Sequence, residues 1–173
     1  MNGDQPIFLI GYRGTGKSTV ARHLAERLGY DSADADAEIE HRAGKSIAAI
    51  FAEDGEAAFR DLESQLVAEL CGLRRTVIAL GGGAVLRETN RNAIREAGPV
   101  VWLTAPVDVI VARLAADPAT AGRRPNLTKL GGRDEVKALL AERTPLYRQC
   151  ATLVVNTDGK TCAQVADEIA ANL

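Results

Sequence analysis

A glycine-rich segment near the start of the chain has the residue types and spacing of a phosphate-binding loop. Residues 11–18 read Gly-Tyr-Arg-Gly-Thr-Gly-Lys-Ser and match the Walker A pattern at every fixed position. Glycines in such a loop let backbone N–H groups turn toward an anion, and the lysine reaches the β- and γ-phosphates of a nucleotide. The residues that we expect to bind the nucleotide here are Gly14, Thr15, Gly16, Lys17, Ser18 and Thr19. Lys17 would also be catalytic, and the Ser18 hydroxyl would ligate Mg²⁺.

A partial repeat of this motif provides an internal control. Gly44-Lys45-Ser46 has the last three letters of the motif, but Ile39 stands where the first glycine would be. No strand pattern precedes it either, so we expect no phosphate there. Instead, Gly44 would end one helix and Ser46 would cap the next.

Two aspartates, Asp34 and Asp36, follow a weak strand pattern at residues 30–33. In an extended segment, side chains two residues apart point the same way, and this pair would lie at the carboxyl edge of a parallel sheet, beside the phosphate loop. One carboxylate could then join the Mg²⁺ shell while the other holds an acceptor hydroxyl. The same spacing also fits a helix N-cap followed by an acidic first turn.

The elements that must position these residues alternate between short apolar runs and longer helical patterns. Strand patterns cover residues 7–10, 30–33, 76–80, 100–104 and 152–156. Helical patterns cover residues 18–28, 46–70 with a break at 54–55, 90–97, 107–116, 133–143 and 161–173. This alternation indicates a parallel sheet covered on both faces. We predict a three-layer, doubly wound α/β fold with a five-stranded parallel sheet, formed by residues 1–173 as a single domain.

One segment, residues 117–132, has no periodicity. It contains two prolines, three glycines and three cationic residues. Loops of this length are uncommon in compact domains and often act as lids or binding loops. We expect a mobile lid over the phosphate loop, with an ordinary surface loop as the alternative.

Composition narrows the possible partners. The chain has a formal net charge of −2 and a pI of about 5.7, which argues against a nucleic-acid binder held by phosphate contacts. The sequence shows no apolar run long enough to cross a bilayer and no signal peptide pattern. Its three cysteines stand at no metal-ligand spacing, as expected in a reducing compartment. We expect a cytoplasmic monomer that binds neither nucleic acid nor membrane.

A phosphate loop alone is shared by kinases, GTPases and motor ATPases. A GTPase would carry an Asn-Lys-x-Asp guanine motif, which this sequence lacks. A motor usually has an apolar strand that ends in aspartate, whereas the strand pattern at 76–80 is followed by Gly81. The small size and the lid-like segment favour a small-molecule kinase.

Further motifs follow in order, and together with the phosphate loop they resemble the shikimate kinase family. They are Asp34-x-Asp36, Phe59-Arg60, Gly81-Gly82-Gly83, Arg124-Pro125 and Arg143-x-Pro145-Leu146-Tyr147. The resemblance implies a P-loop kinase fold of the nucleoside monophosphate kinase type. It also implies transfer of the γ-phosphate of ATP to the 3-hydroxyl of shikimate, with Mg²⁺ as cofactor, in the biosynthesis of chorismate and the aromatic amino acids.

The resemblance further implies roles for the matched residues on the acceptor side. Arg60 and Arg143 would bind the shikimate carboxylate, because forked guanidinium donors suit carboxylates. Asp36 would hold the ring hydroxyls and act as the catalytic base, and Asp34 would lie near Mg²⁺. The glycines Gly81, Gly82 and Gly83 would line the acceptor. Taken singly, the arginines could equally be a solvated helix charge and a helix C-terminal cation, and the glycines a turn.

On the nucleotide side, Arg124 matches the catalytic lid arginine that neutralises charge on the phosphates. Arg113 resembles an arginine beside the adenine, and Lys160 would line the base site. Phe51 and Phe59 would pack either against the acceptor ring or in the core.

Two other functions stay open at this point. One is a related kinase for another small polyol acid, of the gluconate type, although such kinases lack the set of motifs above. The other is a non-catalytic nucleotide-binding regulator that kept the fold. The intact Lys17, Asp34, Asp36 and Arg124 argue against the second.

Overall fold

The computed structural model describes residues 3–117 and 131–173. Its centre is a five-stranded sheet with the strand order β2-β3-β1-β4-β5, in which every neighbouring pair is parallel. The strands are β1 (Ile7–Ile10), β2 (Asp31–Asp34), β3 (Thr76–Ala79), β4 (Val100–Thr104) and β5 (Leu153–Asn156). The predicted sheet is confirmed, and every strand end lies within one residue of the expected position.

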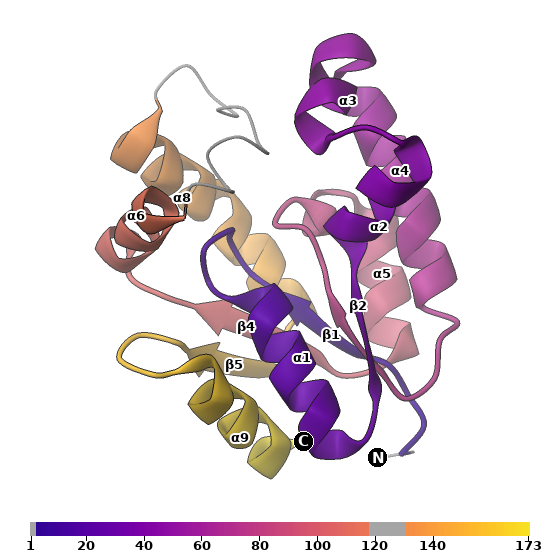
Figure 1. Ribbon diagram of the computed structural model, residues 1–173, viewed down its shortest axis with the longest axis vertical. Coiled ribbons are helices and arrows are strands. Elements are labelled where there is room, and N and C mark those ends of the chain that lie inside the picture. Colours follow the sequence, from indigo (N-terminus) through magenta and orange to yellow (C-terminus); the bar gives the residue numbers. More distant parts are fainter. Residues whose placement is uncertain (1–2, 118–130) are drawn as a thin grey trace.

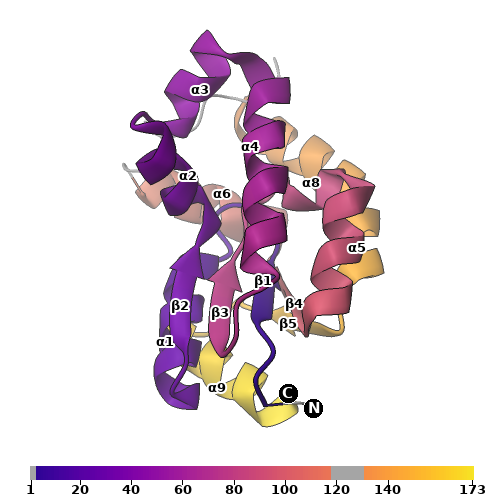
Figure 2. The same cartoon turned by 90° about the vertical axis from the view of Figure 1, so that its right-hand side faces the viewer.

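Helices cover both faces of the sheet and form the predicted three layers (Figure 1). They are α1 (Lys17–Leu28), α2 (Ala35–Ala43), α3 (Ile47–Glu53), α4 (Gly55–Leu70), α5 (Glu88–Ala97), α6 (Val107–Ala116), α8 (Gly132–Cys150) and α9 (Cys162–Asn172), with a 3-10 turn, η1 (Ala84–Leu86). Helices α1 and α9 lie on one face of the sheet, and α4, α5 and α8 lie on the other (Figure 2).

The side chains of the central strand β1 explain the two layers. Leu9 belongs to one apolar cluster with Leu24 of α1 and Ile169 of α9. Its neighbours Phe8 and Ile10 point to the opposite face and belong to a second cluster, formed with α4, α5 and α8. Because a parallel strand is covered on both faces, it reads as a continuous apolar run. This buried strand holds the start of the phosphate loop in a fixed place.

The partial repeat at residues 44–46 ends one helix and begins the next, as predicted. Gly44 ends α2 in the left-handed conformation, with φ 66°. Ser46 is the N-cap of α3, and its hydroxyl accepts a hydrogen bond of 3.1 Å from the backbone N–H of Ala49. The repeat therefore belongs to a turn between two helices, away from any strand.

The predicted end of the helix at residues 133–143 is wrong. Helix α8 continues through Pro145 to Cys150. A proline inside a helix removes one backbone hydrogen bond and crowds the preceding turn. The buried face of α8, which includes Leu139, Arg143 and Tyr147 at four-residue spacing, outweighs this local cost by packing on the sheet side of the molecule.

The other predicted helix boundaries agree with the structure to within two residues, and the expected break separates α3 from α4 at Asp54. Of the predicted lid, residues 118–130 lie outside the described residues. Within the described ranges, no helix is both long and apolar enough to cross a membrane.

Candidate active site

A cavity of about 320 Å³ opens at the carboxyl ends of β1, β2 and β3. In a parallel sheet, ligands bind at this edge where the connections from a central strand leave in opposite directions. Here β1 lies between β3 and β4, so the loop after β1 occupies that position. The cavity is lined mainly by polar and charged residues, including Arg13, Lys17, Ser18, Asp34 and Asp36.

The phosphate loop has the geometry that its glycines predict. Gly16 is the N-cap of α1 with φ 88°, and α1 has no side-chain cap, so its first N–H groups face the cavity without a capping side chain. A Cβ at Gly11 would lie 2.4 Å from the Leu103 carbonyl oxygen, so only glycine fits there. The Lys17 ammonium donates to the Gly11 and Tyr12 carbonyls at 2.8 and 2.9 Å. These bonds hold the charge over the loop.

Two side chains with oxygen atoms that could hold a cation lie next to one another at the start of α1. The Ser18 hydroxyl donates a hydrogen bond to one Asp34 carboxylate oxygen. The other Asp34 oxygen accepts from the Ala37 N–H at 3.1 Å, because Asp34 ends β2 and caps α2. The capping bond fixes the carboxylate beside the phosphate loop.

Of the two arrangements that the sequence left open for Asp34 and Asp36, the extended segment is not the observed one. Asp34 is the last residue of β2, and Asp36 lies in the first turn of α2. The capping geometry that the sequence left as an alternative is the observed one. Both carboxylates nevertheless line the same cavity, because α2 begins directly at the edge of the sheet.

A second hollow adjoins the first and shares Asp36 and Ile47 with it. Its other lining residues are Phe51, Phe59, Arg60, Glu63, Gly81, Gly82, Gly83 and Arg143. The structure thus brings together all the residues that the sequence assigned to the acceptor, from α2, α4, α8 and the loop after β3. The rings of Phe51 and Phe59 lie 4.8 Å apart between their centroids and form one wall.

Both arginines of this hollow are buried. Arg60 is 8% exposed and Arg143 is 5% exposed, so the alternatives of a solvated helix charge and a helix C-terminal cation do not hold. Arg60 donates to the buried Glu63 carboxylate at 2.6 Å. The Arg143 Nε is buried without a hydrogen-bond partner. A buried donor of this kind is costly unless a ligand satisfies it, and an anionic oxygen would do so.

The Glu63 carboxyl is the acid that balances Arg60. Burial raises the pKa of Glu63 above its ordinary value, and the nearby guanidinium groups of Arg60 and Arg143 oppose that rise. With Glu63 held at 2.6 Å, the Arg60 guanidinium is fixed at the hollow rather than free to move into solvent.

In the segment Gly81–Gly83, here called the glycine loop, neighbouring side chains occupy the space of a Cβ at the first and the third position. At Gly81 a Cβ would lie 2.6 Å from an Asp36 carboxylate oxygen. At Gly83 it would lie 2.5 Å from two nitrogens of the Arg60 guanidinium. The loop therefore packs directly against two of the predicted acceptor-binding side chains.

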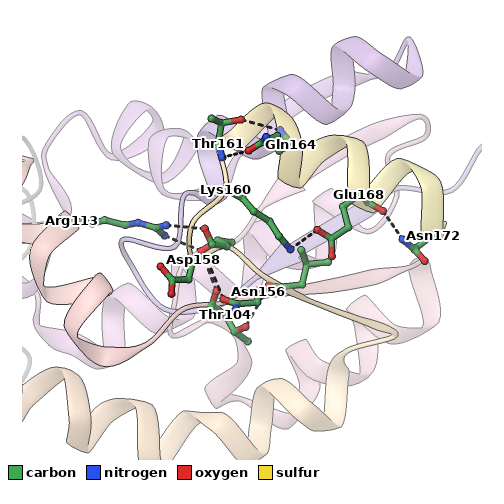
Figure 3. Close-up of polar contacts among 11 residues, drawn as sticks. Thr104, Arg113, Asn156, Asp158, Lys160, Thr161, Gln164, Glu168 and Asn172 are labelled. Atoms are coloured by element: carbon green, nitrogen blue, oxygen red, sulfur yellow. Dashed lines mark hydrogen bonds and ion pairs between the residues drawn. The ribbon is translucent and has the colours of Figure 1, made fainter.

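A third hollow, of about 240 Å³, lies on the other side of Gly16. Arg113 of α6 borders it and donates to the Thr157 hydroxyl at 2.9 Å and to the Thr157 carbonyl at 3.0 Å. Lys160 also borders it, and its ammonium reaches Glu168 at 2.6 Å (Figure 3). The two residues that the sequence placed near the base therefore line one hollow beside the phosphate loop. Arg124 lies outside the described residues.

Several polar residues of this region received no role from the sequence. Glu63 stands one helical turn after Arg60, a spacing that signals a pair but does not reveal its burial. Thr157 directly follows β5, where a polar residue at the carboxyl edge is itself a signal. Arg13 lies within the variable part of the phosphate loop and pairs with the buried Glu135 of α8 at 3.6 Å. No pattern in the sequence indicates that pair.

Comparison with known proteins agrees with this geometry. The family model described as shikimate kinase matches residues 13–173. A shikimate kinase of Rhodopirellula baltica is 48% identical over 98% of this chain and 92% of its own length. One from Nitratidesulfovibrio vulgaris is 49% identical over 93% and 91%, respectively.

Comparison with solved structures agrees with these family matches. The shikimate kinase of Acinetobacter baumannii in complex with shikimate superposes with a TM-score of 0.90 at 36% identity, covering 96% of this chain and 90% of that chain. A gluconokinase of Sinorhizobium meliloti gives a TM-score of 0.58 at 17% identity, covering 99% and 92%. The second likeness is one of fold alone.

Proposed function

This chain belongs to the shikimate kinase family, and we propose that the adjoining hollows at the edge of its sheet bind ATP and shikimate side by side. It is an ATP-dependent kinase that transfers the γ-phosphate of ATP to the 3-hydroxyl of shikimate. The observation that carries our assignment of residues is that Asp36 lines both hollows. We further propose that residues 1–173 act as one kinase domain.

For the nucleotide, we propose that the phosphate loop and α1 hold the phosphates through backbone N–H groups and Lys17. The uncapped start of α1 supports this, because its N–H groups and its dipole favour an anion. Arg113 and Lys160 would border the base, since they line the hollow behind Gly16. Thr19 borders the larger cavity and Thr15 borders the hollow behind Gly16, and both would contact the phosphates.

For the metal, we propose that Ser18 and Asp34 hold Mg²⁺. The contact between this hydroxyl and this carboxylate supports the proposal, because both are hard oxygen ligands. In the described residues no group of three or more His, Cys, Asp or Glu side chains could hold a metal. Mg²⁺ commonly takes only one or two protein carboxylates and completes its shell with phosphates and water. When bound, the ion would neutralise charge on the β- and γ-phosphates.

For the acceptor, we propose that Arg60 and Arg143 bind the shikimate carboxylate and that Asp36 binds the ring hydroxyls. The buried, partnerless Arg143 Nε supports the first assignment. Asp36 would then accept the proton of the 3-hydroxyl as that oxygen attacks the γ-phosphate. The second hollow alone has a volume of only about 20 Å³, so the acceptor ring would also occupy the adjoining part of the larger cavity.

Three further assignments rest on the resemblance and the composition. Arg124 would neutralise charge that spreads over the phosphates during transfer. The protein would act as a monomer without nucleic acid or membrane. It would be cytoplasmic, as expected from the small number and the spacing of its cysteines.

A coupled assay of ADP release over an acceptor panel tests the proposal. With ATP and Mg²⁺, we expect turnover with shikimate and only background hydrolysis with gluconate or with no acceptor. Turnover that does not depend on shikimate would contradict the assignment of the acceptor hollow.

A further inference from the structure

A buried tyrosine hydroxyl joins α8 to the glycine loop. Tyr147 has no exposed surface, and its hydroxyl donates to the Gly82 carbonyl oxygen at 2.6 Å, across 65 residues of sequence. We propose that Tyr147 is a positioning residue for the acceptor, which fixes the glycine loop relative to Arg143. This inference rests on the proposed acceptor site, because its effect is expected on shikimate and not on ATP.

The spacing along α8 links Tyr147 to Arg143. The two residues are one helical turn apart and both belong to the buried face of the helix. A Cβ at Gly82 would lie 3.5 Å from Arg143 Nη1, an ordinary packing distance. Helix α8 therefore meets the glycine loop twice, through a guanidinium that would bind the acceptor and through a hydroxyl that holds the loop beside it.

Different side chains hold the middle of the glycine loop and the segment that follows it. After the loop, the Asn90 side chain donates to the Ala84 carbonyl at 3.0 Å, so α5 fixes that side. In the middle of the loop, the Tyr147 hydroxyl donates its hydrogen bond to the Gly82 carbonyl oxygen. The same glycine packs near the phosphate loop, where its Cβ would lie 3.4 Å from the Gly11 carbonyl oxygen. The tyrosine thus holds the segment that separates the phosphates from the acceptor.

A shift of the glycine loop would change the distance between the two arginines. Gly83 packs on the Arg60 guanidinium, and Gly82 packs on that of Arg143. A carboxylate is bound well by both only when their donors converge. By holding the Gly82 carbonyl, the Tyr147 hydroxyl keeps the loop in the position in which the donors of the two arginines converge. We expect it to do so without contacting the acceptor.

The ring of Tyr147 has a separate role from its hydroxyl. It packs on Trp102 of β4, with ring centroids 5.7 Å apart and an angle of 31°. Tyr147→Phe keeps this ring packing and removes only the hydroxyl group, so we expect the variant to fold. Trp102 is the single tryptophan of the chain and packs on Tyr147, so its fluorescence is the signal to follow while shikimate is titrated.

The test compares two tyrosines that make the same bond. Tyr147→Phe is expected to raise the KM for shikimate about tenfold while the KM for ATP stays nearly unchanged, as expected when a buried carbonyl loses its only phenol donor. The control is Tyr30→Phe, because the Tyr30 hydroxyl also donates to a glycine carbonyl, that of Gly3, at 2.6 Å, far from the site. That control should match the unaltered enzyme. Placing 4-aminophenylalanine at position 147 restores a donor and should recover most of the shikimate affinity, measured by Trp102 fluorescence.

An unchanged KM for shikimate in Tyr147→Phe would overturn the inference. An equal rise in the KM for both substrates would overturn it as well, because it would indicate a general loss of structure. Absence of shikimate turnover in the unaltered enzyme is a different result, which would contradict the proposed function itself.

Discussion

Substituting Gly83 by alanine should damage acceptor binding and leave the fold nearly intact. The added Cβ would lie 2.5 Å from Nη1 and Nη2 of Arg60, and ordinary contact begins near 3.4 Å. The guanidinium must therefore move by about 0.9 Å. The φ of Gly83 is −99°, which alanine adopts without strain, so the whole effect falls on Arg60.

The expected loss of shikimate affinity follows from the hydrogen bond to the acceptor that Arg60 would lose. Its guanidinium is the far end of a long side chain, so it can shift by this distance without unfolding the protein, but it cannot keep its place at the hollow. A hydrogen bond to a charged group contributes about 1.5–3 kcal/mol, which corresponds to a rise of roughly 10- to 150-fold in the dissociation constant for shikimate. The dissociation constant for the nucleotide should stay nearly unchanged, since Gly83 does not line the phosphate cavity.

Calorimetric titration with shikimate measures the effect, and a double-mutant cycle isolates its cause. In the background of Arg60→Ala, the second substitution Gly83→Ala should cost nothing further, because the side chain it displaces is gone. Full shikimate affinity in folded Gly83→Ala would show that Arg60 does not depend on this contact. So would an additive loss in the double mutant.

Three further predictions concern the chemistry and the pH dependence. Asp36→Asn should keep ATP binding and lower the turnover number about 10²- to 10⁴-fold in the coupled assay; near-normal turnover would remove Asp36 as the base. Ser18→Ala should raise the Mg²⁺ concentration for half-maximal activity about tenfold at fixed ATP, and an unchanged requirement would exclude Ser18 from the metal site. Burial raises the pKa of Glu63, so the native state binds this proton more tightly than the unfolded chain. That contribution to stability is present below the ordinary glutamate pKa of about 4.3 and is lost as the pH rises through the raised pKa. Glu63→Gln should therefore flatten the fall of the unfolding midpoint with pH over this window, and an unaltered slope would contradict the assignment.

The elements that depend on local pattern were predictable from the sequence. The run at residues 100–104 is apolar throughout and forms β4, because a strand covered on both faces needs no alternation. Gly44 and Ser46 end and begin helices through their own backbone and hydroxyl chemistry. The phosphate loop is equally local, since its glycines and its lysine act on one short turn.

Features that depend on packing were not predictable. The helix at residues 133–143 was expected to end before Pro145, but the buried face of α8 stabilises the helix past that residue. The sequence left open whether Asp34 and Asp36 share one extended segment or follow a helix cap, and the structure shows that the strand turns into α2 between them. The contact of Arg113 with Thr157 joins residues 44 apart, and no periodicity encodes it. The resemblance supplied the acceptor arginines, and only the fold shows that they are buried together.

Phosphorus and proton NMR of the reaction product determines which hydroxyl of the acceptor is phosphorylated. After incubation of the unaltered protein with ATP, Mg²⁺ and shikimate, we expect one new phosphomonoester whose phosphorus couples to the proton on carbon 3 of the ring, in equal amount to the ADP formed. ADP with inorganic phosphate alone, or phosphate on another hydroxyl, would contradict the placing of Asp36 between the two hollows.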